Sequence, residues 1–267
     1  NGACNGAGAC SVTMTGTQRV TATFTLDTHV LLTATTGTGS GFVNLNPGEE
    51  SYDYGTAVTV TATAATGSAF AGWNGACSGT GACSVTMTET ERVTATFTLN
   101  SYALLTATIG AGSGAVGLNP AAGPYTHGTV VTATATAATG STFAGWSGDC
   151  SGAGPCVVTM DGAKTVTATF TLSSYALSTA TTGMGSGSVS LNPAGSPYAH
   201  GAVVTATATA DTGSTFSAWS GDCSGTGACS VTMTETKRVT ATFTLNSYAL
   251  STATAGSGGG AVSLNLA

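Results

Sequence analysis

The chain has 267 residues and a net charge of −6, and only 6% of its residues are charged. Nucleic acids and anionic membranes bind through clusters of basic side chains, so a chain with 5 Lys+Arg excludes both as partners. A free cytosolic protein depends on charge for solubility, so this composition favours a secreted, glycosylated or polymeric protein instead.

The sequence is built from a repeat of 73 residues, which its cysteines mark. They form four pairs with five residues between the members, and equivalent cysteines such as Cys77 and Cys150 lie 73 residues apart. A fixed period of this length indicates that each copy is one structural unit. We assign complete repeats to 29–101, 102–174 and 175–247, the C-terminal part of a repeat to 1–28, and the N-terminal part of another to 248–267.

In the first half of the middle repeat, short apolar runs are separated by glycine and proline. Residues 102–108 and 115–118 predict two strands that form a hairpin across a glycine-rich link. Residues 121–128 predict a loop. Residues 131–137 alternate Val or Ala with Thr, which predicts a strand with one face towards a core and one towards solvent.

The second half of the repeat continues the strand pattern. Residues 142–146 predict a short strand, and residues 156–160 and 164–172 predict a second hairpin that turns at Asp161-Gly162. No segment shows the 3.6-residue period of a helix. The sequence therefore predicts an all-β fold, a tandem array of small β modules.

The cysteine pairs predict disulfides, and hence an oxidising compartment. A structural zinc site needs four ligands whereas each repeat supplies two cysteines, and no Cys-x-x-Cys redox motif occurs. Closing a loop of about 7 residues contributes about 2.4 kcal/mol in the chain-entropy model. That staple matters in a module this small. The cysteines are Cys4, Cys10, Cys77, Cys83, Cys150, Cys156, Cys223 and Cys229.

Each complete repeat has one tryptophan before its cysteines and one tyrosine in the predicted loop. We expect Trp73, Trp146 and Trp219 to fill a core otherwise built of Ala and Val, in preference to stacking on sugars. We expect Tyr52, Tyr125 and Tyr198 to be exposed and to be possible contacts for a ligand, with carbohydrate as the candidate.

No constellation of residues supports catalysis, a metal or a cofactor. His127 and His200 have no partnered Ser or Cys nucleophile, and no Gly-x-Ser-x-Gly elbow occurs. Asp149 and Asp222 are single acids where glycoside hydrolysis needs a pair, so we interpret them as turn residues. The Gly-x-Gly-x-Gly run at 110–114 lacks the nucleotide-binding spacing and is interpreted as a turn.

Rows of threonine such as Thr132, Thr134 and Thr136 recur in every complete repeat. Flat threonine arrays are used by ice-binding surfaces, and exposed threonines can carry O-linked glycans. Alternating threonine is also the ordinary pattern of a solvent-facing strand, which we favour.

Several of these motifs together resemble the divergent InlB B-repeat family of bacterial surface proteins. They are the run Thr142-Phe-Ala-Gly-Trp146 after Tyr125-Thr-His-Gly128, the Trp-Ser-Gly-Asp-Cys-Ser-Gly segment from Trp146, and the closing Val-Thr-Ala-Thr-Phe at 166–170. The resemblance covers essentially the whole chain. It implies β-grasp-like or all-β modules in tandem in adhesins, stalks and other extracellular proteins, with no catalytic residues to carry over.

The alignment of the repeats places Asn1 opposite Asn74 and Ala267 opposite Ala194, so both ends of the sequence fall inside a repeat. We expect either a longer continuous array or subunits that complete one another by strand exchange. Both predict a non-enzymatic extracellular structural protein that self-associates or continues into a filament, stalk or fibre. The alternative is an adhesin segment that binds carbohydrate or matrix through the loop tyrosines or a tryptophan.

Overall fold

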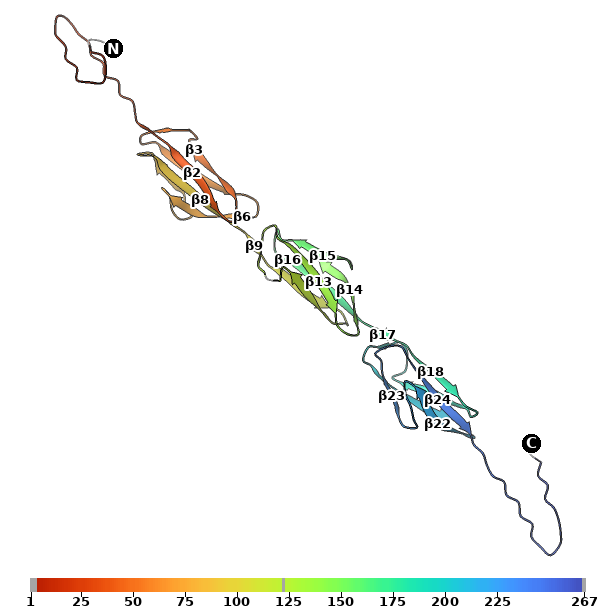
Figure 1. Ribbon diagram of the computed structural model, residues 1–267. Helices are drawn as coiled ribbons and strands as arrows, with labels where there is room; N and C mark the ends of the chain where they lie inside the picture. Colours follow the sequence, from red (N-terminus) through yellow and green to blue (C-terminus); the bar gives the residue numbers. More distant parts are fainter. Residues whose placement is uncertain (1–3, 122, 266–267) are drawn as a thin grey trace. The chain divides into compact units, whose positions relative to one another are not determined.

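The computed structural model describes residues 4–121 and 123–265, all of it in strands and connecting loops (Figure 1). No helix occurs in these ranges, which confirms the all-β prediction, and the separate sheets give no support to the β-grasp-like alternative. The chain divides into two compact units. The first comprises Asn1–Leu104, Ala122–Val131 and Thr159–Lys164, and the second comprises Leu105–Ala121, Thr132–Val158 and Thr165–Ala267.

The first unit contains one complete two-sheet module. Its two three-stranded sheets have the orders β2-β8-β6 and β3-β5-β7, and a two-stranded ribbon pairs β1 with β4. A second ribbon in this unit pairs β9 (Ser101–Tyr102) with β12 (Tyr125–Thr126). The strands of the module are β1 (Thr28–His29), β2 (Leu31–Gly37), β3 (Gly41–Asn46), β4 (Tyr52–Asp53), β5 (Ala57–Ala64), β6 (Ser68–Gly75), β7 (Cys83–Thr86) and β8 (Glu91–Leu99).

The second unit contains most of the middle repeat and the whole third repeat, and both have the same strand orders. Its first pair of sheets has the orders β10-β16-β14 and β11-β13-β15, built from β10 (Leu104–Ile109), β11 (Gly114–Asn119), β13 (Val130–Ala137), β14 (Ser141–Gly148), β15 (Cys156–Thr159) and β16 (Lys164–Leu172). The second pair has the orders β18-β24-β22 and β19-β21-β23, with a β17-β20 ribbon. Its strands are β17 (Ser174–Tyr175), β18 (Leu177–Thr182), β19 (Gly187–Asn192), β20 (Tyr198–Ala199), β21 (Val203–Ala210), β22 (Ser214–Gly221), β23 (Cys229–Thr232) and β24 (Lys237–Leu245).

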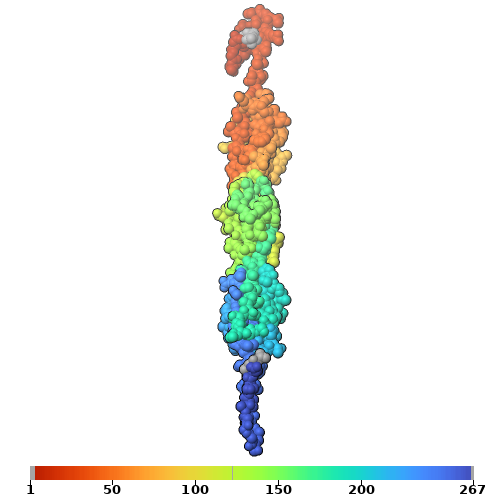
Figure 2. Space-filling model, turned by 90° about the vertical axis from the view of Figure 1, so that its right-hand side faces the viewer, coloured from red at the N-terminus to blue at the C-terminus, as the bar shows by residue number. Residues whose placement is uncertain are grey.

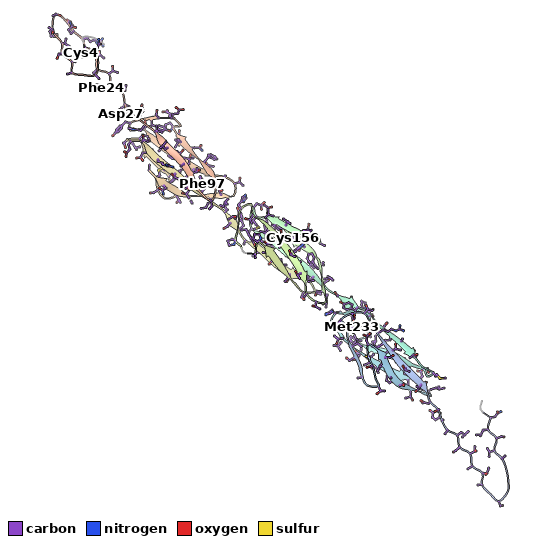
Figure 3. All side chains as sticks on the ribbon, in the orientation of Figure 1. Cys4, Phe24, Asp27, Phe97, Cys156 and Met233 are labelled. Carbon is purple, nitrogen blue, oxygen red and sulfur yellow. A yellow bond between two sulfur atoms is a disulfide. The ribbon has the colours of Figure 1, made fainter. Side chains whose placement is uncertain are left out.

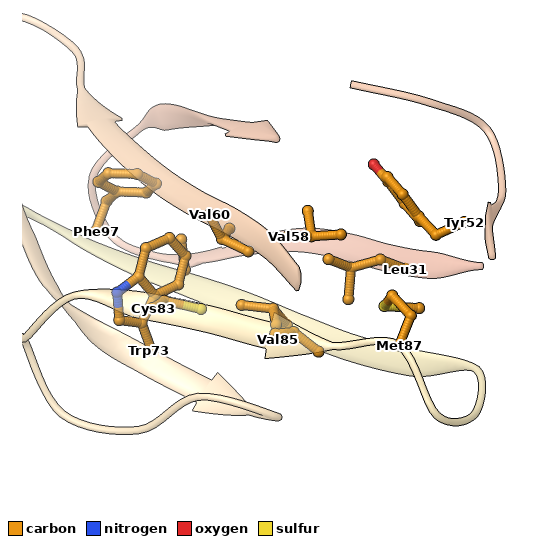
Figure 4. Close-up of a cluster of buried hydrophobic side chains, with 11 residues drawn as sticks. Leu31, Tyr52, Val58, Val60, Trp73, Cys83, Val85, Met87 and Phe97 are labelled. Atoms are coloured by element: carbon orange, nitrogen blue, oxygen red, sulfur yellow. The ribbon is translucent and has the colours of Figure 1, made fainter. Parts of the chain in front are cut away.

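The core of each module lies between its two sheets, because the strands alternate apolar and threonine residues. In the first unit Val58 and Val60 of β5 belong to one buried cluster with Val93 and Phe97 of β8. Figure 4 shows Val58, Val60 and Phe97 in this cluster. The threonines between them turn outwards, and no polar or charged side chain among the described residues is buried. This period of two gives each strand one apolar face.

The predicted hairpin between residues 102–108 and 115–118 is wrong. The strands that form there, β10 and β11, lie in different sheets, so the glycine-rich link between them crosses from one sheet to the other. The glycines are needed because the link lies against β16: a Cβ on Gly110 would stand 2.0 Å from the Phe170 carbonyl oxygen. The same residues that indicate a turn therefore serve a close approach of two backbones.

The second predicted hairpin is also wrong. Strands β15 and β16 follow one another in sequence, but β15 joins β13 while β16 joins β14. In the third repeat the last strand, β24, instead pairs in parallel with the first long strand, β18, from the pair Leu177–Lys237 to the pair Thr182–Thr242. Strand period alone cannot distinguish two neighbours in one sheet from two strands in facing sheets.

Residues 4–27 and 246–265 form no strand. The segment 18–26 repeats the sequence pattern of β8, yet no strand lies beside it among the described residues. Consequently Phe24 is 91% exposed, whereas its counterparts Phe97, Phe170 and Phe243 are 0% exposed. Figure 3 shows Phe24 away from any sheet and Phe97 within one, and in Figure 2 the segment that follows β24 is a narrow, separate stretch of chain.

These paired phenylalanines give a test of the core. Phe97→Ala removes a fully buried ring, so we expect the free energy of unfolding of its module to fall by about 3–5 kcal/mol. Phe24→Ala is the matched control at the same repeat position, and it should change stability by less than about 0.5 kcal/mol. Urea unfolding followed by tryptophan fluorescence measures both, and equal effects would contradict the assignment of the core.

Candidate functional site

The most distinctive local structure of each repeat is the loop that carries the cysteines. In the middle repeat this loop leaves β14 after Gly148 and enters β15 at Cys156, so it crosses from one sheet to the other. The backbone N–H of Trp146 donates to the Gly152 carbonyl at 2.7 Å, which folds the loop back along β14. In the first repeat the indole N–H of Trp73 also donates to Gly81, at 3.1 Å.

A disulfide closes each of these loops. The Cα atoms of Cys77 and Cys83 are 5.6 Å apart, and those of Cys150 and Cys156 are 5.5 Å apart. In the three complete repeats the second cysteine, Cys83, Cys156 or Cys229, is the first residue of a strand and is buried, which fixes the end of the crossover within the core. The bridges are Cys4–Cys10, Cys77–Cys83, Cys150–Cys156 and Cys223–Cys229, and no free cysteine occurs in the described chain.

The tryptophans lie in the cores, with exposures of 8% for Trp73, 6% for Trp146 and 5% for Trp219. Each packs at a steep angle against a phenylalanine three residues earlier; the ring centroids of Phe143 and Trp146 are 5.1 Å apart and the rings are 61° from parallel. That phenylalanine in turn contacts the buried phenylalanine of the central strand, with 5.8 Å between Phe143 and Phe170. These distances are those of favourable aromatic pairs.

A shallow groove opens beside this aromatic cluster in every complete repeat. In the middle repeat it has a volume of about 340 Å³, and its counterparts measure about 260 Å³ and about 300 Å³. Phe143 and Trp146 line it from one sheet, Thr132 and Thr134 from the other, and the cysteine loop closes one side. Apolar rings, alanines and threonines line the groove, and no charged residue does.

The groove exists because the strand after the cysteine loop is shorter than its neighbour. In the third repeat β23 pairs only with Val203–Ala206, the first half of β21. Residues 207–210 of β21 therefore have no strand on that side within the described chain.

The outward-facing threonines of the long central strand form only one row, because the residues opposite them on the neighbouring strand are not a second row of threonines. Thr134 lies opposite Gly117, and Thr61 lies opposite Asn44.

The tyrosines that we expected to be exposed are buried, so the prediction for Tyr52, Tyr125 and Tyr198 is wrong. Their exposures are 1%, 4% and 6%. Each begins the second strand of a ribbon, and in two repeats the hydroxyl donates to a proline carbonyl five residues earlier at 2.9 Å, from Tyr52 to Pro47 and from Tyr198 to Pro193. The loop therefore folds over the tyrosine ring. A loop sequence that contains proline does not by itself predict this burial.

The structure also identifies a contact between consecutive repeats that the sequence analysis missed. The imidazole of His127 lies on Gly67, in the turn between β5 and β6, so closely that a Cβ there would stand 2.1 Å from its Cδ2 atom. Asn100 donates its N–H to Gly67 and accepts the N–H of His127, both at 2.8 Å. His200 repeats the contact on Gly140 in the second unit. The recurrence of histidine at one repeat position was the available signal.

The acidic residues beside the cysteines act as hydrogen-bond acceptors. The Asp149 carboxylate accepts the N–H of Thr165 at 2.6 Å, and Asp222 accepts the N–H of Arg238 at 2.7 Å. The hydrogen bond from the Arg238 backbone N–H, aided by the Lys237 ammonium 3.3 Å away, lowers the pKa of Asp222 below its ordinary value. In the described residues no three metal-ligating side chains cluster, and no helix could span a membrane.

Comparison with known proteins identifies the repeat. A sequence model with the description Divergent InlB B-repeat domain matches residues 30–101, 105–174 and 177–247. A solved structure, the TIE protein of Bacillus anthracis, aligns with 76% of this chain at 8% sequence identity and a TM-score of 0.41. The alignment covers 49% of the chain in that structure, so this chain spans about half of its length. No curated protein matches the sequence.

The contact between His127 and Gly67 can be tested with a matched pair of glycines. Gly67 and Gly213 occupy the same turn with φ of 75° and 80°, but nothing lies within 4 Å of a Cβ on Gly213. Alanine at either site carries about 1–2 kcal/mol of left-handed strain. Only Gly67→Ala also displaces an imidazole, so we expect the larger loss of unfolding free energy there, and His127→Ala should relieve part of it. Equal losses in urea unfolding would contradict the contact.

The cysteine loop gives a second test. Replacing Cys150 and Cys156 together by Ala opens the crossover, and we expect the module to lose about 2 kcal/mol. The same double replacement at Cys4 and Cys10 is the control, because residues 4–27 form no strand that the bridge could stabilise. Chemical denaturation of both variants decides. If the control lost as much stability, the bridge would not act through the two-sheet module.

Proposed function

Because this chain belongs to the divergent InlB B-repeat family of bacterial surface proteins, we propose that it is a non-enzymatic structural repeat of an extracellular filament, stalk or fibre. The family accounts for the repeats and supports a location outside the cell. The proposal adds that the modules themselves are the functional part. Low charge, disulfides and cores without buried polar side chains all suit a protein that persists outside the cell.

The observation that carries this proposal is the connection from one repeat to the next. A single residue, Asn100, separates β8 from β9. The ribbon that β9 forms then packs on the turn of the preceding repeat, where the His127 ring lies on Gly67. The Asn100 N–H donates to the Gly67 carbonyl, and in the second unit the Ser173 N–H donates to the Gly140 carbonyl in the same way. Tandem modules that share packed contacts gain stability from their neighbours, which suits a structural array.

Self-association is the second part of the proposal. The segment 18–26 has the alternating pattern of a strand and exposes Val20, Phe24 and Leu26. Unpaired backbone next to exposed apolar side chains favours pairing with another chain. We propose that this segment pairs with the other strands of a repeat, either within a longer continuous array or from another copy of the chain, and that the second case joins copies lengthwise into a filament.

Electron microscopy and light scattering of the purified chain test this role. We expect concentration-dependent fibres, and Phe24→Asp should abolish them because it places a charge on the associating segment. Met184→Asp is the control, since Met184 is 90% exposed in a turn outside that segment. Monodisperse monomers at all concentrations would overturn the filament.

A second candidate function is carbohydrate binding in the groove beside Phe143 and Trp146. The three equivalent grooves, each lined by aromatic rings and threonine residues and by no charged residue, favour a neutral sugar. This candidate replaces the loop tyrosines, which are buried. A glycan array probed with the full chain tests it, and a blank array would remove it.

A further inference from the structure

The first and last long strands of a repeat are parallel neighbours. In the first repeat β2 pairs with β8 from Leu31–Glu91 to Gly37–Phe97, and in the third β18 pairs with β24 in the same way. The chain enters β2 at one end of this pair and leaves β8 at the other. A force that draws the entry and exit points apart therefore acts along both strands and in opposite directions on the two.

The direction of the force decides how the hydrogen bonds between the strands fail. The bonds of a parallel pair are evenly spaced along it. When the strands are pulled along their length, all of these bonds are strained together and must break together. When the strands are pulled apart from one end, the bonds break one at a time.

We propose that each repeat is a mechanical clamp, in which the parallel β2–β8 pair resists tension along the chain. The inference deepens the structural role proposed above and rests on it. It names the stress that the repeat withstands and the strands that withstand it. The counterpart pairs are β18 with β24, and β10 with β16, which are also neighbours in their sheet.

The surroundings of β8 strengthen the clamp. It is the central strand of its sheet, between β2 and β6, and its side chains Val93, Ala95 and Phe97 are all 0% exposed. Beyond β2, Gly39 still donates its N–H to the Phe97 carbonyl at 3.0 Å. Water must reach a strained bond before it can replace it, so a strand covered on both edges and on its inner face holds its bonds longer.

The disulfide lies outside the clamp and limits how far a failed repeat extends. Cys77 and Cys83 close a loop between β6 and β7, so this loop stays shut when β2 and β8 separate. Unravelling from Leu31 to Leu99 then releases about 20 nm of chain, and reduction of the bridge adds about 2 nm, at 3.3–3.6 Å per residue.

Single-molecule pulling on the folded chain tests the proposal by changing only the points of attachment. Handles at Asp27 and Thr98 load the pair along its length, whereas handles at Asp27 and Glu89 open it from one end. Asp27, Glu89 and Thr98 are all exposed, so handles there leave the fold intact. We expect a severalfold higher unfolding force in the first geometry, and equal forces would overturn the clamp.

A pair of proline variants locates the resistance in the ladder. Glu91 donates its N–H to the Val30 carbonyl, so in this parallel ladder the N–H of Ala34 points to β8 and that of Thr33 points away. Ala34→Pro should lower the force of one event when the whole chain is pulled from its ends, and Thr33→Pro should lower it much less. The other two repeats serve as internal standards. Equal effects of the two prolines would contradict the clamp.

If Ala34→Pro prevents the first repeat from folding, two events remain and the comparison of attachment points decides. The outcome is also separable from the proposed function. Equal forces in both geometries remove the clamp but leave the filament, which is tested by assembly. A chain that stays monomeric but resists force along β2 and β8 removes the filament and keeps the clamp.

Discussion

The pairing of the last strand of each repeat with the first and fourth long strands is the interaction on which the rest of the module depends. In the first repeat β8 lies between β2 and β6, and its Val93, Ala95 and Phe97 supply the only fully buried row in that sheet. The Phe97 ring then requires glycine opposite it: a Cβ on Gly41 would stand 2.4 Å from the ring. Neither sheet can be displaced without exposing this ring. The module is therefore completed only when its final residues are in place.

The core of the first module has only eleven buried side chains, four of them Val, and the structure compensates for this small core in two ways. Within the repeat, the disulfide restrains the crossover from β6 to β7, where the chain passes between sheets. Between repeats, the ribbon that carries His127 packs on the preceding turn at Gly67. Small modules bury a small fraction of their surface and need such additions. Covalent closure and neighbour contacts replace the larger hydrophobic core that a single domain of this length would have.

The repeat, the strands and the fold class were predictable because they follow from local periodicity. The alternation of Val or Ala with Thr over 131–137 predicts β13 almost residue for residue. The pairing of strands was not predictable, because β10 and β11 have the same local pattern as a hairpin and differ only in what lies beside Gly110. The burial of Tyr52 depends on a loop that folds back so that the Pro47 carbonyl, five residues earlier, accepts the tyrosine hydroxyl. The glycine that His127 contacts belongs to another repeat. Such long-range contacts leave no periodic trace.

The spacing of the cysteines has a consequence for biosynthesis. Eight cysteines allow 105 pairings, and a tandem array would offer many wrong bridges between repeats. Here each partner lies six residues away, as in Cys150–Cys156, and short loops close at the lowest entropic cost. Oxidation therefore selects the native bridge locally, before the rest of the repeat is assembled. Additional copies can be added to such a gene without adding errors of pairing, so the length of the array is free to vary.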